Sequence, residues 1–162
     1  MSLDTLAYIG LGSNLEQPAA QLRRALLALD RLPRTRLVRA SRLYRTPPWG
    51  RTDQPEFVNA VAELETALAA PALLAALQEL ERGAGRERAE RWGPRVLDLD
   101  LLVLGGVEID QPGLRLPHPH LHERAFVLVP LAELSPELIV PGQGRVADLR
   151  AAVDCRGIEA LG

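Results

Sequence analysis

The sequence contains no lysine, so all 19 of its basic residues are arginines. With 21 acidic residues, the formal net charge is -2 at pH 7. A slightly acidic chain argues against a general binder of nucleic acid or of anionic membranes, which would need excess positive charge. Because lysine is missing throughout, arginine at one position carries no information, but the clustering of arginines along the chain does.

Cysteine and long apolar runs are also scarce. The single Cys155 excludes an intrachain disulfide framework and fits a reducing compartment, and we interpret it as an inert thiol. No run of about 18 apolar residues occurs, and no basic segment precedes an apolar one at the N-terminus. We therefore expect no membrane span and no signal peptide, and a cytoplasmic location follows by default. We also expect a monomer. A chain of 162 residues with 47% hydrophobic content predicts one domain over 1–162.

The six aromatic residues are few for a chain of this length. Four of them fall in or beside polar, loop-like stretches: Trp49, Phe57, Trp92 and Phe126. Large rings placed outside the aliphatic segments indicate a flat ligand held by stacking. The alternative is that each ring covers an edge of the core.

Apolar periodicity predicts the order of elements. We expect strands over 5–12, 35–45, 57–66 and 96–103, with helices over 18–32 and 71–82 between them. A turn at Gly105 leads into 107–109, expected as a short hairpin partner. A helix ending at Leu134, an extended segment over 138–140 and a helix over 146–153 follow. Strand-helix-strand-strand-helix-strand is the order of a ferredoxin-like α+β sandwich, with a mainly antiparallel sheet and helices on both faces.

Three segments carry few chemical signals. Val38, Ala40 and Tyr44 are expected to point inward from the strand over 35–45. Gly12, Ser13 and Asn14 predict a strand-to-helix turn, and they lack the Gly-Lys-Ser/Thr signature of a phosphate loop. The stretch 46–56 has three prolines and a glycine and cannot be regular structure.

The strongest chemical signal is an acid pair that follows an arginine-rich loop. Asp98 and Asp100 lie two apart in a strand, so both project from one face about 7 Å apart, opposite Leu97, Leu99, Leu101 and Val103. Five arginines precede them: Arg82, Arg86, Arg88, Arg91 and Arg95. Carboxylates with a cationic loop are expected where a metal-bound polyphosphate is handled. A solvated strand edge is the plainer alternative for the acid pair alone.

Two further groups deserve interpretation. Phe57 and Asn59 share one face of a strand, which would set a stacking surface beside an amide, although an exposed polar edge would look the same. His118, His120 and His122 suggest zinc, but Pro119 breaks the spacing and no cysteine or acidic ligand lies in a matching frame.

Several strings resemble one family, the 6-hydroxymethyl-7,8-dihydropterin pyrophosphokinases of folate synthesis. They are Y-I-G-L-G-S-N-L (8–15), Y-R-T-P-P-W-G (44–50), D-Q-P-E-F-V-N-A (53–60), E-R-W-G-P-R-V-L-D-L-D (90–100) and L-P-H-P-H-L-H-E-R-A-F (116–126). The resemblance implies transfer of pyrophosphate from ATP to the pterin hydroxymethyl group, leaving AMP.

The resemblance also implies roles for individual residues. Asp98 and Asp100 would hold two Mg²⁺ ions, and Arg86 and Arg95 would be catalytic. ATP would contact Gln78, Glu81, Arg88, Arg95, Leu101, His118 and Arg124. The pterin would contact Thr46, Pro47, Trp49, Phe57, Asn59, Trp92 and Phe126. The implied partners are these two small substrates, with neither nucleic acid nor membrane.

Two rival readings explain less of the sequence. A nucleotidyltransferase with a Gly-Ser motif would place its acid pair on the next strand, whereas Ser13 and Asp98 are far apart. A ferredoxin-like RNA-binding module would need aromatics in its strand centres and net positive charge, and the sequence has neither.

Overall fold

The computed structural model describes residues 4–14, 17–46, 56–84 and 97–161. Its elements are, in chain order, β1 (Thr5–Ser13), α1 (Pro18–Leu29), β2 (Thr35–Ala40), β3 (Leu43–Thr46), β4 (Phe57–Thr66), α2 (Ala70–Gly83), β5 (Asp98–Leu104), β6 (Ile109–Gln111), β7 (Leu114–Leu116), the 3-10 helix η2 (Leu121–Glu123), α3 (Ala125–Leu134), β8 (Ile139–Val140), β9 (Gly144–Arg145), α4 (Val146–Ala151) and β10 (Glu159–Leu161). No helix within these ranges is both long and apolar enough to cross a membrane.

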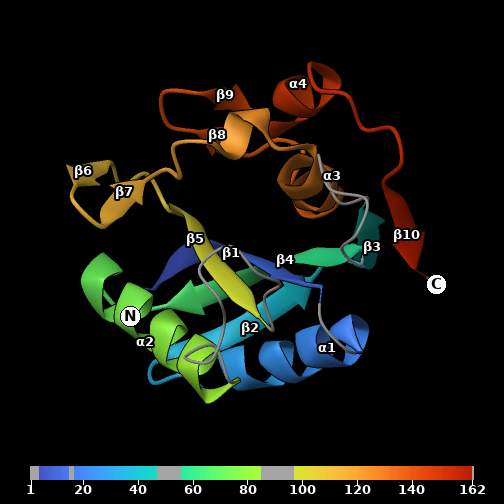
Figure 1. Cartoon of the computed structure of the whole chain (residues 1–162). Coiled ribbons are helices and arrows are strands. Elements are labelled where there is room, and N and C mark those ends of the chain that lie inside the picture. The colour runs from blue at the N-terminus through green and yellow to red at the C-terminus, as the bar shows by residue number, and fades with distance from the viewer. Residues whose placement is uncertain (1–3, 15–16, 47–55, 85–96, 162) are drawn as a thin grey trace.

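The central sheet is antiparallel and has the strand order β10-β3-β4-β1-β5, with β2 also paired to β4. Helices α1 and α2 cover one face, and α3 and α4 cover the other (Figure 1). This is the predicted α+β sandwich with helices on both faces. Because β1 lies between β4 and β5, segments from both halves of the chain meet along its length.

Each face of the sheet has its own apolar core. Val58, Ala60, Ala62 and Leu64 of β4 join the core beneath α1 and α2, as predicted from their alternation. Val61 points the other way, into the core beneath α3 and α4. The alternation of β4 therefore serves two buried layers. The face toward α1 and α2 is apolar from Val58 to Leu64, whereas the face toward α3 also carries the buried polar residues Asn59 and Glu63.

The strand predicted over 35–45 is two strands, β2 and β3, both paired to β4. Between them Ser41 exchanges hydrogen bonds with Val61: its N–H donates to the carbonyl, and its Oγ accepts from the N–H. The inward placement predicted for Val38 is wrong. The pairing skips this residue between Leu37 and Arg39, and the bulge leaves Val38 exposed. Tyr44 is buried, as predicted.

Strand β5 carries a second bulge. Tyr8 pairs with Val103 and Ile9 with Leu101, so Leu102 has no partner of its own on β1. As a result Val103 joins Leu102 in the core beneath α3, although regular alternation predicted it beside Leu101. The alternation predicted for Asp98, Leu99 and Asp100 is kept, because these residues lie before the bulge.

The prediction that residues 107–109 form a hairpin with β5 is wrong. Strand β6 pairs with β7 in a separate two-stranded sheet and not with β5. Helix α1 ends at Leu29, earlier than predicted, and Asp30 then accepts a hydrogen bond from the Leu37 N–H that draws the chain toward β2. Helix α4 likewise ends at Ala151, two residues before the predicted end.

Candidate functional site

The acid pair faces two glycines across the sheet. Asp98 pairs with Gly12 and Asp100 with Gly10, so both carboxylates rise on the α3 side of the sheet beside positions that have no side chain. Each aspartate is half-buried. The absence of side chains at Gly10 and Gly12 leaves room over the sheet next to the carboxylates, where a ligand can approach the backbone closely.

Asn59 lies next to Gly12 and the acid pair. It pairs with Gly12 on the other side of β1, and its side chain is buried. The Thr46 hydroxyl donates to Asn59 Oδ1 at 2.9 Å, which orients the amide. A Cβ at position 12 would lie only 2.8 Å from Asn59 Nδ2, so this amide needs glycine beside it.

A cavity of about 300 Å³ opens between the sheet and the N-terminal end of α3. The sheet contributes Gly10, Gly12, Asn59, Asp98 and Asp100, and the helix end contributes Arg124, Phe126 and Val127. Its size lies at the small end of the range for ligand pockets. This cavity is thus lined by an amide, an aromatic ring, two carboxylates and a guanidinium.

Arg124 links the helix end to the acids. Its Nη1 lies 4.0 Å from Asp100 Oδ2, and its guanidinium carbon lies 5.7 Å from the centre of the Phe126 ring. Phe57 begins β4, two residues before Asn59 and on the same face, but it is not among the described residues that line this cavity. The structure therefore places Phe126, but not Phe57, in the lining of this cavity.

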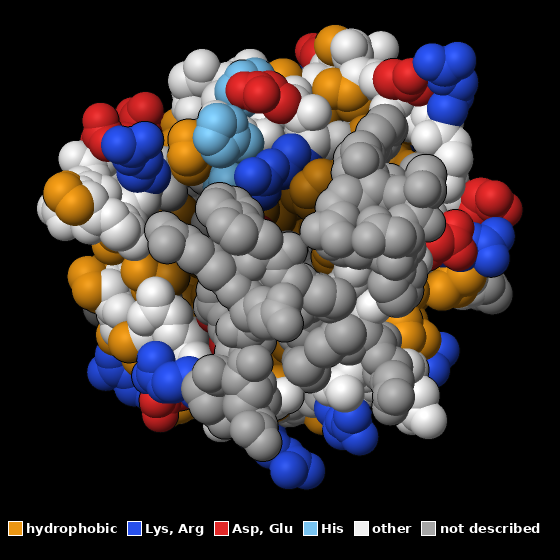
Figure 2. Space-filling model, in the orientation of Figure 1, with side chains coloured by type: hydrophobic (Ala, Val, Ile, Leu, Met, Phe, Trp, Pro, Cys, Tyr) orange, Lys and Arg blue, Asp and Glu red, His pale blue; other side chains and the backbone are white. Residues whose placement is uncertain are grey.

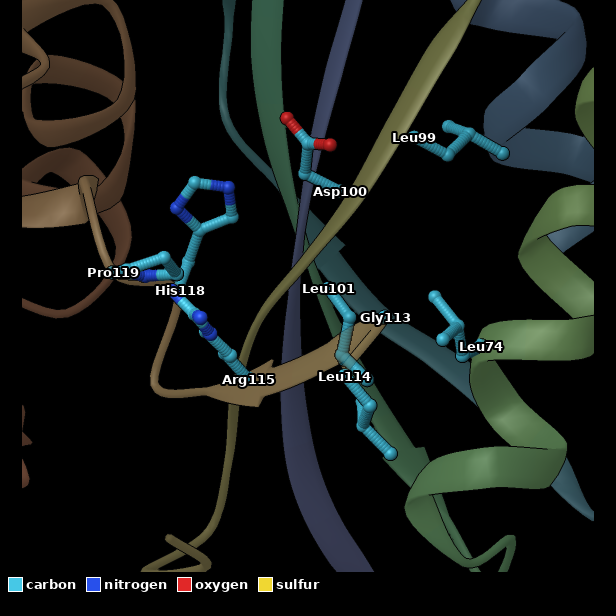
Figure 3. A pocket seen from close by; sticks show the side chains of 9 residues that line it. All are labelled: Leu74, Leu99, Asp100, Leu101, Gly113, Leu114, Arg115, His118 and Pro119. Atoms are coloured by element: carbon cyan, nitrogen blue, oxygen red, sulfur yellow. The ribbon is translucent and has the colours of Figure 1, made fainter. Parts of the chain in front are cut away.

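A second cavity, of about 320 Å³, lies on the other side of Asp100 (Figure 3). Leu74 reaches it from α2, Leu101 from β5, and Leu114 and Arg115 from the β6–β7 hairpin, while His118 faces Asp100. The face shown in Figure 2 has histidine side chains beside basic side chains. Asp100 lines both cavities, so one carboxylate stands between two ligand-sized volumes.

His118 is held by backbone contacts on both sides. Its N–H donates to the carbonyl of the bulged Leu102, and its own carbonyl accepts from Gln143 Nε2. Burial, and to a lesser degree the charges of Arg124 and His120, lower the pKa of His118 to about 4. The imidazole is therefore neutral near pH 7, and it can donate or accept a hydrogen bond but adds no charge.

Glu81 and Gln78 lie on α2, near β5. Glu81 is buried, and its Oε2 accepts the Leu99 N–H at 2.8 Å, between the two acids of the pair. Gln78 is exposed one turn after Leu74. The structure thus gives Glu81 a contact with the strand that the sequence did not predict.

Six of the predicted site residues lie outside the described residues: Pro47, Trp49, Arg86, Arg88, Trp92 and Arg95. Several lining residues were not predicted as site residues, among them Gly10, Gly12, Leu74, Leu114 and Arg115. Leu114 and Arg115 could not be predicted from sequence periodicity, because the two strands of their hairpin have only three residues each. Within the ranges that the structure describes, His118, His120 and His122 belong to no cluster of three or more metal-ligating side chains.

Comparisons with known proteins match one family over most of the chain. Residues 8–136 match the family model of 7,8-dihydro-6-hydroxymethylpterin-pyrophosphokinase (HPPK). The 2-amino-4-hydroxy-6-hydroxymethyldihydropteridine pyrophosphokinase of Pseudomonas aeruginosa is 52% identical over 154 residues, covering 95% of each chain. The protein of the same name from Haemophilus influenzae is 46% identical over 143 residues, covering 88% of this chain and 89% of the relative.

Solved structures show the same fold. An HPPK-DHPS structure in complex with substrates superposes with a TM-score of 0.78 at 10% identity, over 99% of this chain and 47% of that one. Wild-type Plasmodium falciparum HPPK-DHPS gives a TM-score of 0.70 at 13% identity, over 91% of this chain and 41% of that one. This chain thus spans less than half of those solved chains. The match over 8–136 and the identity to full-length relatives show that the chain belongs to the 7,8-dihydro-6-hydroxymethylpterin-pyrophosphokinase family.

Proposed function

We propose that this enzyme transfers the pyrophosphoryl group of ATP to the hydroxymethyl group of 6-hydroxymethyl-7,8-dihydropterin, giving the pterin diphosphate and AMP in folate biosynthesis. The observation that carries the proposal is the pair of cavities that meet at Asp100. A two-substrate transfer needs both substrates held at once, with the reacting groups meeting at the shared wall. Membership of the pyrophosphokinase family supplies the identity of the substrates.

The cavity beside α3 suits the pterin. A pterin is a flat ring with an amide edge, and this cavity offers the Asn59 amide, fixed by Thr46, and the Phe126 ring. Aromatic faces and a few fixed polar groups are the usual means of holding such a ring. Phe57, Pro47, Trp49 and Trp92 complete the pterin set that we propose.

The cavity beside the hairpin suits the nucleotide. Leu74, Leu101 and Leu114 offer apolar contacts for a base, and Arg115 and His118 offer donors for phosphate or ribose oxygens. Arg124 lines the neighbouring cavity and can add a donor where the two cavities meet at Asp100. Gln78, Glu81, Arg88 and Arg95 belong to the same proposed set. Arg86 and Arg95 would stabilise charge on the transferring group, since phosphoryl-type transfer depends mainly on positioning and charge neutralisation.

Two Mg²⁺ ions fit the acid pair. Asp98 and Asp100 supply hard carboxylate oxygens on one face of β5, and the glycines opposite leave space for an ion with its remaining ligands. The metal would neutralise phosphate charge when bound. Arg124 lies beside Asp100 and can add a donor to the same phosphate group.

The reaction is tested by its products. Purified enzyme is incubated with ATP, Mg²⁺ and the hydroxymethyl pterin, and AMP is measured against ADP. Equal amounts of AMP and pterin diphosphate are expected. Formation of ADP would instead indicate transfer of a single phosphoryl group and would refute the proposal.

The metal assignment is tested by Asp98→Ala and Asp100→Ala. Loss of several kcal/mol of charge stabilisation predicts a fall in kcat of at least about a hundredfold. Circular dichroism and the melting temperature should stay close to those of the wild type, because both side chains are half-buried and lie in no apolar core. Wild-type turnover in either variant would refute the assignment.

We also propose that residues 1–162 form one domain and that the protein is a monomer in the cytoplasm. Its partners would be the two small substrates, without nucleic acid. Sedimentation at working concentration tests the oligomeric part. A mass near 17.7 kDa is expected.

A further inference from the structure

Helix α3 forms one wall of the proposed pterin cavity with its first turn only. Arg124, Phe126 and Val127 line the cavity. Phe126 and Glu133 are separated by seven residues, or about 10 Å along the helix axis. The last turn therefore lies well outside the cavity, and it is held by polar contacts with the sheet.

The sequence of α3 does not by itself fix the rotation of the helix. Its residues are A-F-V-L-V-P-L-A-E-L, and those from Val127 to Leu131 are all buried. Apart from Glu133 near its end, the helix is apolar on all sides, so no polar stripe along its length sets which side faces the sheet. A rotation by one residue, about 100°, would turn Phe126 away from the cavity while apolar side chains still faced the sheet. Directional contacts must then determine the rotation.

The first such contact joins Glu133 to β3. The Tyr44 hydroxyl donates to Glu133 Oε1, and the Arg42 N–H donates to Oε2 at 3.1 Å. The Arg42 guanidinium lies 5.7 Å from the centre of the Tyr44 ring and also contacts Glu133. Tyr44 pairs with Asn59 in the sheet, so this contact ties the helix to the strand that carries the proposed pterin amide.

The second contact joins the end of α3 to β1. The Tyr8 hydroxyl donates to Glu63, and Ser135 Oγ lies 2.9 Å from the same hydroxyl and can donate to it. Arg39 donates to Glu63 at 2.7 Å and to Ser135 at 3.2 Å. Burial and the hydrogen bond to Glu63 raise the pKa of Tyr8 to about 12, so this hydroxyl keeps its proton at neutral pH.

We propose that Tyr44 with Glu133, and Tyr8 with Ser135, are positioning residues that set the rotation of α3 and so hold Phe126 and Arg124 over the cavity. Apolar packing holds the helix on the sheet, while the hydrogen bonds of the Tyr44 and Tyr8 hydroxyls fix its rotation. The kinetic consequence rests on the proposed function, but the placement of Phe126 does not.

The test variants are Glu133→Ala, Ser135→Ala and the double variant. Alanine favours the helix, so the last turn should not be lost through propensity. Glu133→Gln keeps an acceptor for the Tyr44 hydroxyl, so this variant should behave nearly like the wild type. Thr66→Val is the matched control, because it removes a buried hydroxyl that bonds Thr35 at the other end of β4, away from α3.

The first readout needs no substrate. The chain has two phenylalanines, Phe57 and Phe126, so protein labelled with 4-fluorophenylalanine gives two ¹⁹F resonances, assigned with Phe57→Leu and Phe126→Leu. In the double variant we expect the Phe126 resonance to shift or split, while the Phe57 resonance stays in place. An unchanged Phe126 resonance would overturn the proposal. A shift of both resonances in the Thr66→Val control would also overturn it, since general loosening would then explain the result.

The second readout is kinetic. We expect the double variant to raise the KM for the pterin at least fivefold at saturating ATP. The KM for ATP should rise less, because Arg124 is one of several proposed contacts to the nucleotide. Equal changes in both KM values would overturn the link between α3 and the pterin. If the wild type forms no AMP, the proposed function fails, and the fluorine readout still decides the placement of Phe126.

Discussion

At the scale of single residues, two glycines determine how closely a ligand can approach the sheet. Gly10 and Gly12 alternate with Ile9 and Leu11, whose side chains fill the core beneath α1 and α2. The sequence predicted the acids opposite them, because an acid pair in an apolar strand stands out. It did not predict the role of the glycines, since Gly12 looked like part of a turn, whereas β1 continues through Ser13.

The role of Gly12 is tested by Gly12→Ala. The new Cβ would lie 2.8 Å from Asn59 Nδ2, so the amide must move, and we expect the KM for the pterin to rise at least about tenfold, equivalent to 1.4 kcal/mol. Gly10→Ala is the comparison, because its Cβ meets Leu102 at an ordinary 3.5 Å and should raise the KM less. Equal effects of the two substitutions would contradict this account of Asn59.

His118 predicts a pH dependence of stability. Its folded pKa of about 4 lies below the ordinary value of 6.5, so the unfolded chain binds more protons between these values. Stability should therefore rise as pH increases from about 4 to 6.5 and then level off. His118→Gln should flatten this part of the curve, measured as the urea midpoint at successive pH values. His122→Gln, at an exposed position, is the control and should keep the slope.

At the scale of elements, β5 shows where prediction from sequence succeeds and where it stops. Periodicity covered every strand of the main sheet except β10 and gave the bounds of β4 correctly, but it merged β2 and β3 into one strand. It could not foresee the bulges at Val38 and Leu102, because a bulge depends on the partner strand, which a single segment does not encode. It also missed β6 and β7, which have three residues each and too few positions for a period.

Glu81 supports β5 from outside the sheet. Its carboxylate accepts the N–H of Leu99, a buried residue. Glu81→Ala should lower the free energy of unfolding by about 1–3 kcal/mol, because a buried N–H loses its acceptor. Glu81→Gln keeps an acceptor of the same length and should lose less. Urea unfolding of the two variants makes the comparison, and equal losses would mean that the hydrogen bond to Leu99 is unimportant.

At the scale of the whole molecule, the site is assembled from distant parts of the chain. The cavity proposed for the pterin draws on β1, β4, β5 and α3, and the cavity proposed for the nucleotide draws on α2, β5 and the β6–β7 hairpin. The antiparallel order of the sheet brings Asn59 and Asp98 to opposite sides of Gly12. The sequence strings named most of these residues, but their grouping into two cavities depends on the sheet order.

A shared wall predicts coupling between the two substrates. Because Asp100 lines both cavities, a magnesium nucleotide bound as proposed would change the surroundings of the pterin. We expect the pterin to bind at least tenfold more tightly in the presence of Mg²⁺ and a non-hydrolysable ATP analogue, about 1.4 kcal/mol of coupling, measured by calorimetry. The nucleotide should tighten by the same factor when pterin is present. Independent affinities would show that the cavities do not communicate.

The bulge at Leu102 also has a consequence for how β5 tolerates deletions. Deleting either Leu101 or Leu102 yields the same shortened string, in which the remaining leucine can pair with Ile9 while both aspartates keep their orientation. Deleting Leu99 instead makes the aspartates neighbours and drives one of them into the aliphatic layer under α1 and α2. Either of the first two deletions also removes one buried leucine from the core beneath α3, so a codon-by-codon deletion scan should find it less destabilising than deletion of Leu99 but not neutral.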